Sequence, residues 1–405
     1  MWGQATAEPL TLTRALVAQR AALGRLRVFV GIGVAPTLEP AHADGFDFIG
    51  YSAAGSHRAL AEEGLLDILP VHYSQLPDLM RRRVLPVDVL LLQVSAPDKD
   101  GRHSLGYATE YLLAAMATAR VVIVEVNADV PWTHGECSLG PRDADLFVKA
   151  RFAPAQQEVL RTGAVEQAIA RHVAGLVEDG ATLQMGIGAV PDAVAGALRG
   201  HRDLGLHTGA AGDGVAGLAL SGVLTNARKT RDQGVSVAGL LLGGAAVREW
   251  AHDNRKLCMR GTDYTHHPDV LASIDKLVAI NSAIEVDLSG QVNAEVANEC
   301  YIGAVGGAAD FLRGAARSRG GVPIIALPST TARGRSRIVP ALCGPVSTSR
   351  SDVGFVVTEH GIADLRGQSL SNRVRRLVEV AAPTYREGLL HEAHYAFRRA
   401  GAPLN

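Results

Sequence analysis

Two glycine-rich turns are the segments of this sequence best suited to bind a ligand through backbone groups. The first, Gly186-Ile187-Gly188, follows a strand-like apolar run and precedes a helical segment. Glycines at such a turn let backbone N–H groups approach a ligand, and the N-terminus of a helix favours an anionic group. A pyrophosphate or a chain of pantetheine amides would suit this turn. A plain tight turn between a strand and a helix explains the same residues, so the pattern leaves both interpretations open.

The second turn covers residues 303–311 and precedes another helical segment. Its adjacent glycines, Gly306 and Gly307, can present two backbone N–H groups, which is what an oxyanion hole requires. The two glycines can equally be there to supply positive φ angles. The spacing alone favours neither interpretation.

Titratable side chains gather in two further places. Glu285 and Asp287 alternate at the end of a predicted strand and could act as an acid–base pair, although a salt-bridged turn is the more usual reason for such a pair. His266 and His267 are the one adjacent pair of histidines, and a pair in a loop is predicted to lie on the surface. No histidines stand at metal-ligand spacing and no C-x-x-C pair occurs, so we expect no metal site.

The elements that must position these residues follow an alternating pattern. Short apolar runs rich in β-branched residues alternate with helix-period segments, which indicates an α/β fold. Continuous apolar runs of this length are typical of strands buried on both faces, as in a parallel sheet covered by helices. The predicted strands are 26–31, 87–94 and 119–126 in the first part, and 182–186, 276–281, 322–327 and 353–358 in the second.

A chain of 405 residues suggests two domains. Residues 164–178 have helical apolar spacing and end at Asp179-Gly180, a helix stop. We place the boundary just before this helix, which gives an N-terminal domain of residues 1–155 and a C-terminal domain of residues 156–405.

The composition excludes several classes of function. Lys and Arg number 40 against 41 Asp and Glu, so the basic excess typical of a nucleic-acid binder is missing. The apolar runs are strand-sized, and we expect no membrane span. Four scattered cysteines and an N-terminus unlike a signal peptide predict a reduced, cytoplasmic protein.

Long ordered stretches of the chain resemble the acetyl-CoA hydrolase/CoA-transferase family, the group that includes the 4-hydroxybutyrate and butyrate CoA-transferases. The segment Leu206-His207-Thr208-Gly209 carries the resemblance at the expected reacting centre, and the likeness spans almost the whole chain. The resembling stretches are 88–101, 104–106, 124–127, 131–135, 179–194, 203–215, 281–295, 310–315, 336–340, 348–353 and 357–365.

The resemblance implies two α/β domains with largely parallel sheets, in the NagB/RpiA-like CoA-transferase fold, with coenzyme A bound mostly by the second domain. It implies ping-pong chemistry, in which a glutamate attacks an acyl-CoA and a glutamyl-CoA thioester forms through an anhydride. Coenzyme A or acyl-CoA is then a substrate, with no permanently bound cofactor, and a homodimer or homotetramer is expected. The residues that the resemblance assigns to coenzyme A are Gly186, Gly188, Ala189, Val190, Pro191, Gly306 and Gly307.

The chain departs from the family's pattern at the reacting centre. Gly209 stands where the family has its nucleophilic glutamate, and a glycine cannot form a glutamyl intermediate. The family's asparagine near Pro268 is replaced by His266 or His267, and the glycine that opens the family's G-x-G-G turn is Ala304.

These departures lead to three hypotheses. In the first, an acyl-CoA-processing enzyme moves the acyl group directly to a small acceptor, with His266, His267 or Asp213 as general base and Gly209 leaving room for the acceptor. In the second, a conventional carboxylate CoA-transferase or acyl-CoA hydrolase uses another carboxylate. In the third, the chain is a non-catalytic acyl-CoA-binding homologue. The carboxylates considered for the second hypothesis are Glu285, Glu295 and Glu299.

Overall fold

The computed structural model describes residues 1–157 and 162–399, and side chains through residue 394. In its first part, two parallel three-stranded sheets lie one after the other along the chain, with orders β1-β2-β3 and β4-β6-β9. A two-residue ladder, β5-β8, lies beside them. The strands are β1 (Leu26–Val30), β2 (Phe46–Gly50), β3 (Leu66–Ile68), β4 (Val89–Val94), β5 (His103–Ser104), β6 (Val121–Val126), β8 (Ser138–Leu139) and β9 (Leu146–Lys149). The helices of this part are α1 (Leu10–Leu23), α2 (Arg58–Glu62), α3 (Leu76–Arg81) and α4 (Leu112–Thr118).

The second part is built on a nine-stranded sheet with the order β22-β21-β19-β14-β10-β11-β12-β13-β7. All neighbouring strands run parallel except the edge pair β21 and β22. The strands are β7 (His134–Gly135), β10 (Thr182–Met185), β11 (Gly205–Gly212), β12 (Ser236–Leu242), β13 (Leu257–Met259), β14 (Leu277–Asn281), β19 (Val322–Ala326), β21 (Phe355–Thr358) and β22 (Gly361–Asp364).

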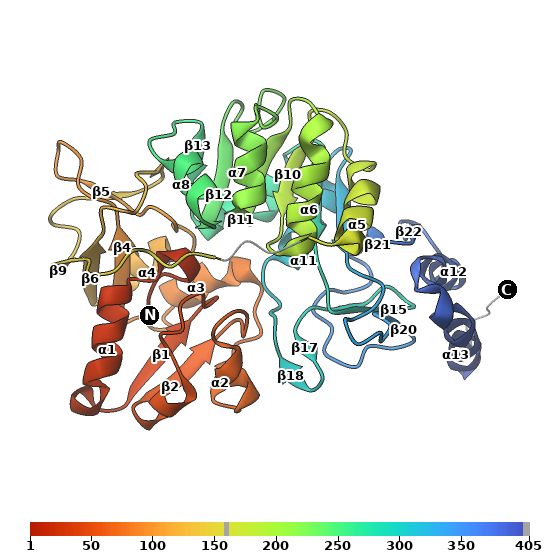
Figure 1. Cartoon of the computed structure of the whole chain (residues 1–405), viewed down its shortest axis with the longest axis horizontal. Helices are drawn as coiled ribbons and strands as arrows, with labels where there is room; N and C mark the ends of the chain where they lie inside the picture. The colour runs from red at the N-terminus through yellow and green to blue at the C-terminus, as the bar shows by residue number, and fades with distance from the viewer. Residues whose placement is uncertain (158–161, 400–405) are drawn as a thin grey trace.

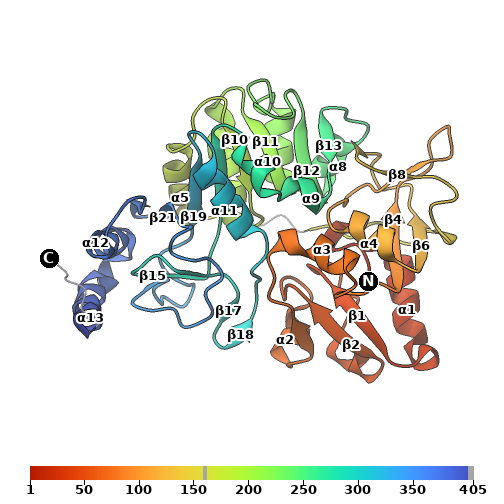
Figure 2. The ribbon, with the colours of Figure 1, turned by 180° about the vertical axis from the view of Figure 1, so that it is seen from behind.

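Helices cover both faces of this sheet. Figure 1 shows α5, α6 and α7 on the near face, and the opposite view in Figure 2 shows α9, α10 and α11 on the other. The C-terminal helices α12 and α13 lie at the β22 edge, away from the first part (Figure 1). The helices are α5 (Ala164–Ala174), α6 (Ala189–Ala197), α7 (Asp213–Leu220), α8 (Ala245–Ala251), α9 (Thr262–Thr265), α10 (Pro268–Ala272), α11 (Ala308–Arg317), α12 (Leu370–Val380) and α13 (Arg386–Arg399).

Short elements complete the fold. Two small sheets, β16-β15-β20 and β17-β18, lie below the large sheet (Figure 1), and five 3-10 helices occur along the described chain. The strands are β15 (Glu285–Asp287), β16 (Val292–Asn293), β17 (Val296–Ala297), β18 (Cys300–Tyr301) and β20 (Ile338–Val339). The 3-10 helices are Ala5–Ala7, Pro40–Asp44, Tyr73–Gln75, Leu198–Gly200 and Pro383–Tyr385.

The predicted α/β architecture with largely parallel sheets is confirmed. Each predicted apolar run forms a strand whose ends agree within about two residues, because such runs suit strands covered on both faces. The predicted helix 164–178 instead ends at Ala174, where Gly175 forms the C-cap. A helix propensity about 1 kcal/mol below that of alanine makes a glycine a natural place for a helix to end.

The two parts are joined through the large sheet. Strand β7, from the first part of the chain, pairs with β13 at one edge of that sheet. The backbone of residues 107–109 also bonds to β12, through Leu241 N to Tyr107 O and Thr109 N to Gly239 O. One buried apolar cluster accordingly includes Leu92 of the first part together with Leu183 and Leu240 of the second. The division near residue 155 stays a prediction.

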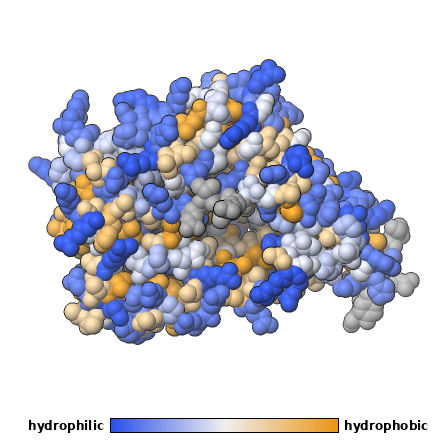
Figure 3. Space-filling model, viewed as in Figure 1, coloured by the Kyte–Doolittle hydropathy of each residue, from blue (hydrophilic) through white to orange (hydrophobic). Residues whose placement is uncertain are grey.

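Figure 3 shows a hollow near the centre of one face, where the first part of the chain meets the second, with apolar residues at its lower rim. Over residues 1–157 and 162–399, no helix has the length and the apolar character needed to cross a bilayer.

Candidate functional site

A cavity of about 180 Å³ lies where strands β10 and β11 meet the first part of the chain. We call it the central cavity. It brings together Gly209, His266 and both predicted glycine turns, from segments far apart in the sequence. Its lining residues are Gln4, Ile32, Tyr51, Ser52, Tyr73, Glu110, Gln184, Met185, Gly186, Ile187, Gly209, Ala210, Leu240, His266, Asn281, Ala304, Gly306, Gly307, Ala308 and Phe311.

Gly209 lies in β11 and faces the imidazole of His266. A β-carbon added to Gly209 would lie 2.8 Å from Cε1 and 2.9 Å from Nε2 of His266. Such contacts are closer than real β-carbons make, so a side chain at position 209 would require the imidazole to move. The space next to Gly209 is therefore already filled by His266.

The ring of His266 also touches the second glycine turn. A β-carbon on Gly307 would lie 2.6 Å from its Nε2, so glycine is needed here for close approach. The ring is further held by aromatic side chains, with its centroid 4.6 Å from that of Phe311 and 5.0 Å from that of Tyr73. These neighbours hold the imidazole between the two glycines.

Hydrogen bonds define which ring nitrogen of His266 faces the cavity. The Thr265 hydroxyl lies 2.8 Å from Nδ1 and donates to the carbonyl of Gly261 at 3.3 Å. The hydroxyl has a single proton, so whether it donates to Nδ1 or accepts from it depends on the tautomer of the ring. Nε2 lies on the side of Gly209 and Gly307, and it carries a lone pair there in the tautomer whose proton is on Nδ1.

Burial keeps His266 neutral. The side chain is 3% exposed, and burial, followed by the nearby His207, lowers the pKa of His266 to about 3. Burial and the Lys229 charge likewise lower the pKa of His207 to about 3. At neutral pH the ring can accept a proton but supplies no positive charge to hold an anion.

The turn with Gly306 and Gly307 forms one wall of the central cavity. Gly306 has φ +58, in the region that favours glycine, and Gly307 is the N-cap of α11. The first part of the chain holds this turn in place, because Tyr73 N donates to Gly306 O at 2.9 Å. Ala304 lines the same wall.

The first glycine turn lies between the central cavity and a second cavity of about 540 Å³. Met185, Gly186 and Ile187 line both cavities. Gly188 lines the second cavity and has φ +120, which a residue with a β-carbon adopts only with strain. Pro191 also lines the second cavity. The turn thus borders both the larger second cavity, which we call the outer cavity, and the small central one.

Two of the residues predicted to bind coenzyme A are outside both cavities. Val190 is 6% exposed and packs into the apolar core, because the first turn of α6 directs it toward the sheet. Ala189 starts α6 and lines neither space.

The other predicted acid–base residues are elsewhere. His267 is exposed, as predicted, and its side chain accepts a hydrogen bond from the backbone N–H of Asp269 as the N-cap of α10. The prediction of a surface position is wrong for His266, which is buried. Asp213 lines the second cavity and accepts backbone N–H groups from Gly244 at 2.9 Å and Val247 at 3.1 Å, at the start of α8.

Glu285, Glu295 and Glu299 do not line the central cavity. The Glu285 carboxylate accepts hydrogen bonds from Nδ2 of Asn293 and the backbone N–H of Cys343. The Asp287 carboxylate accepts hydrogen bonds from the Ser289 hydroxyl and the Gln291 side-chain amide. This pair forms a hydrogen-bonded turn in place of the expected salt-bridged one.

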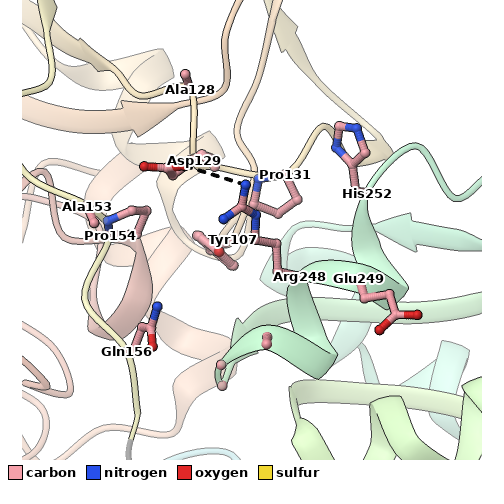
Figure 4. Close-up of a pocket in the computed structure, with 14 residues that line it drawn as sticks. Tyr107, Ala128, Asp129, Pro131, Ala153, Pro154, Gln156, Arg248, Glu249 and His252 are labelled. Atoms are coloured by element: carbon pink, nitrogen blue, oxygen red, sulfur yellow. Dashed lines mark ion pairs between the residues drawn. The ribbon is translucent and has the colours of Figure 1, made fainter.

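A third cavity, of about 550 Å³, lies between the first part of the chain and helix α8. Figure 4 shows Arg248 extending from α8 toward Asp129, and the two charged groups lie 3.5 Å apart. Tyr107 lies beside them, and Gln156 and His252 stand farther apart around the opening (Figure 4). The Arg248–Asp129 ion pair links α8 to the first part of the chain.

Sequence reasoning missed one group of the central cavity. Glu110 is 2% exposed, and burial raises its pKa to about 7 against the lowering effect of hydrogen bonds from Tyr73 and Gln4. The Gln4 amide donates to Oε2 at 2.7 Å, and the Tyr73 hydroxyl donates to the same oxygen. Gln4, Tyr73 and Glu110 are too far apart in sequence for any local pattern to have linked them.

Two family models match the chain: the acetyl-CoA hydrolase/transferase N-terminal domain over residues 1–141 and the C-terminal domain over residues 243–393. The chain is 38% identical to the 4-hydroxybutyrate coenzyme A transferase of Clostridium kluyveri, over 97% of this chain and 92% of that protein. It is 39% identical to a succinyl-CoA:acetate/propanoyl-CoA:succinate CoA transferase of Fasciola hepatica, over 86% and 74% of the two chains.

Solved structures agree with these matches. The crystal structure of RipA from Yersinia pestis is similar with a TM-score of 0.93 and 33% identity, covering 98% of this chain and 93% of that one. A 4-hydroxybutyrate CoA-transferase from Porphyromonas gingivalis is similar with a TM-score of 0.80 and 34% identity, at the same coverage.

Proposed function

Because the chain belongs to the acetyl-CoA hydrolase/transferase family, we propose that it transfers an acyl group directly from an acyl-CoA to a small acceptor, without a glutamyl-CoA intermediate. It is an enzyme of this family, and the family makes acyl-CoA the substrate class. The proposal concerns the route that the acyl group takes.

The relation between Gly209 and His266 carries the proposal. The resemblance puts the nucleophilic glutamate of the family at position 209, and glycine has no side chain to attack a thioester. The neighbouring imidazole lies within 2.9 Å of where a β-carbon would be, so it takes the place of the missing side chain. A neutral histidine in that place offers a lone pair to the acceptor proton, so we assign it general base catalysis in place of covalent catalysis, although burial lowers its pKa and makes it a weaker base than a free imidazole.

The arrangement supports a sequence of steps in which atoms balance. The acceptor X–H lies in the central cavity, and Nε2 of His266 takes its proton as X attacks the thioester carbonyl. Backbone N–H groups of Gly306 and Gly307 stabilise the developing oxyanion. The carbon–sulfur bond then breaks, and the coenzyme A thiolate receives the proton from His266. The products are the acyl acceptor and free coenzyme A.

Coenzyme A is assigned to the outer cavity. Gly186, Gly188 and Pro191 line that space, and the residues shared with the central cavity bring the two spaces next to each other, as binding of the pantetheine arm beside the reacting centre requires. We leave His267 and Asp213 out of the catalytic set, because neither lines the central cavity.

A displaced carboxylate is the less supported route. Glu285 and Glu295 are engaged by other groups, Glu295 by the hydroxyls of Ser347 and Tyr301. A misplacement of ~1 Å can cost ~100-fold in rate, so a nucleophile outside the cavity would be ineffective. Glu110 lies inside the cavity, but its Oε2 already accepts two hydrogen bonds and its Oε1 is buried.

Chemical trapping tests the proposal. The purified enzyme is incubated with an acyl-CoA and with methanol or acetate as acceptor, treated with borohydride or hydroxylamine, digested and analysed by mass spectrometry. We expect turnover of the acyl-CoA and no modified glutamate in any peptide. A reduced or hydroxamate-labelled glutamate, on Glu110 or elsewhere, would contradict the proposal. Absence of turnover by the pure chain would support a non-catalytic homologue instead.

A further inference from the structure

Glu110 lines the central cavity next to the strands that carry Gly209 and Gly239. It follows residues 107–109, which bond to β12, and it forms a bridge with Gly261. A β-carbon on Gly239 would lie 3.0 Å from the carbonyl oxygen of Gly209 and 3.7 Å from Cβ of Glu110. The glycine at 239 therefore lets Glu110 lie close to the strand that carries Gly209.

The carboxylate of Glu110 has one occupied and one free oxygen. Oε2 accepts hydrogen bonds from the Tyr73 hydroxyl and from the Gln4 amide, and the Gln4 carbonyl oxygen is fixed in turn by the Tyr51 hydroxyl at 2.6 Å. Oε1 is buried and has no hydrogen-bond partner among the described residues. An unpaired buried carboxylate oxygen is costly to ionise, so hydrogen bonds from the described residues balance the negative charge of Glu110 at Oε2 alone.

No positive charge balances Glu110 in the cavity. Among the described residues that line it, none is lysine or arginine. The titratable groups that face Glu110 are Tyr51, Tyr73 and Tyr111, whose pKa values burial raises, and the neutral His266 across the Tyr73 ring. Above about pH 7, where Glu110 ionises, the one charge carried by the described residues that line this cavity is negative.

We propose that the central cavity takes an uncharged O–H or N–H acceptor and excludes carboxylates, with Glu110 as the residue that sets this preference. The proposal rests on the proposed function and names the acceptor class for it. An anionic acceptor would lie near an uncompensated carboxylate in a buried site, where charge repulsion is strong. An uncharged hydroxyl or amine avoids this repulsion.

The chemistry of the products favours the same class. Without an enzyme glutamate, attack by a carboxylate on the thioester would release coenzyme A and leave a free mixed anhydride. Attack by an alcohol, an amine or water gives an ester, an amide or an acid, with the acceptor proton ending on the coenzyme A thiol.

A comparison of acceptors tests the proposal. The enzyme is given one acyl-CoA with methanol, with acetate, or with water alone, at about pH 8, where Glu110 is ionised. Methyl ester, acetyl-CoA and free acid are measured by chromatography. We expect ester or free acid to form at least about tenfold faster than acetyl-CoA. Equal or faster formation of acetyl-CoA would overturn the proposal.

A matched pair of variants identifies the residue responsible. Glu110→Gln keeps an acceptor for Tyr73 and Gln4 and removes the charge. Glu8→Gln is the control, since Glu8 is equally buried, also has a pKa raised by burial to about 7, and lies outside the three cavities. We expect the rate ratio of acetate to methanol to rise at least about tenfold in Glu110→Gln alone. An unchanged ratio in that variant would overturn the role of Glu110.

A change of pH tests the role of the Glu110 charge in the wild-type enzyme, without any substitution. Acetate keeps its charge between about pH 6 and about pH 8, whereas Glu110 becomes neutral toward the lower value. The ratio of acetate to methanol should therefore rise as the pH falls, and a flat ratio would contradict the proposal. A glutamyl adduct in the trapping experiment would refute the proposed function, whereas adduct-free transfer to acetate would refute only the acceptor class.

Discussion

The imidazole of His266 occupies the space next to Gly209, with Nε2 2.9 Å from the position that a β-carbon on residue 209 would take. Glycine at 209 and histidine at 266 are therefore one structural unit: the absence of a side chain at one position makes room for the ring at the other. Changing Gly209 alone to the glutamate that the resemblance implies, or His266 alone to asparagine, should therefore leave the pair mismatched.

Gly209→Glu alone should not produce an efficient CoA-transferase. The new side chain would collide with His266, and an imidazole beside it would hold the carboxylate in an unproductive orientation. Adding His266→Asn and Ala304→Gly removes the collision and opens the turn, so we expect the triple variant to exceed the single variant by about 100-fold or more. The assay is formation of acetyl-CoA from an acyl-CoA and acetate.

A single variant that reaches about 10 s⁻¹, a typical enzyme turnover, would contradict this expectation, because the surroundings of position 209 would then be an intact transferase site. The His266→Asn, Ala304→Gly double variant, which lacks a glutamate at 209, serves as the control.

His266→Ala should lower the turnover of acyl-CoA by about 10²- to 10⁴-fold, the usual contribution of a general base. The KM should change little, since the ring acts on the acceptor proton. His267→Ala is the matched control: that side chain is exposed and lines none of the three cavities, so its activity should stay within about twofold. Comparable losses in both variants would show that His266 has no special role.

Acid should destabilise the protein partly through His266. Its folded pKa is lowered to about 3, below the ordinary value of 6.5, so protons bind the unfolded state preferentially. The resulting stability is present above about pH 6.5 and is lost as the pH falls toward 3. From about pH 7 to about pH 5, the free energy of unfolding of wild type should fall by about 2 kcal/mol more than that of His266→Gln.

Urea unfolding of both proteins at the two pH values measures this difference. The buried Glu8 and Glu110, whose raised pKa values act in the opposite direction, are common to both proteins and cancel in the comparison. A constant difference between the two proteins would mean that His266 titrates normally in the folded state.

Gly188→Ala should weaken coenzyme A binding by about tenfold and cost about 1–2 kcal/mol of stability, because φ +120 strains any residue with a β-carbon. Gly196→Ala, in the same helix α6 with open space around it, is the control. That substitution should leave binding unchanged and stabilise the helix by up to about 1 kcal/mol. Calorimetric titration and thermal unfolding measure the two effects; unchanged binding by Gly188→Ala would remove the turn from the coenzyme A site.

The sequence predicted the strands that are apolar along their whole length, such as β14 and β19, because their burial on both faces leaves a local pattern. It did not predict β11, whose residues Gly205–Gly212 include three glycines and have low strand propensity. That segment becomes a strand because β10 and β12 pair with it on either side.

At the site, too, the sequence predicted the features that a local pattern determines and missed those that depend on contacts between distant segments. The glycine turns were found because a strand, a glycine turn and a helix follow one another along the chain. His266 and His267 look alike in sequence, and only the packing of Tyr73 and Phe311 around one ring separates the buried histidine from the exposed one. Glu110 gave no signal, because its hydrogen-bond partners come from segments 37 and 106 residues away.

A single turnover in water enriched in ¹⁸O tests the central claim most directly. Enzyme in excess over an acyl-CoA is quenched after one turnover, and mass spectrometry locates the label in the released acid and in the protein. Direct transfer predicts ¹⁸O in the acid and none in any glutamate. A glutamyl route would release an acid carrying an unlabelled enzyme oxygen and leave ¹⁸O in a glutamate side chain, and that result would contradict the account.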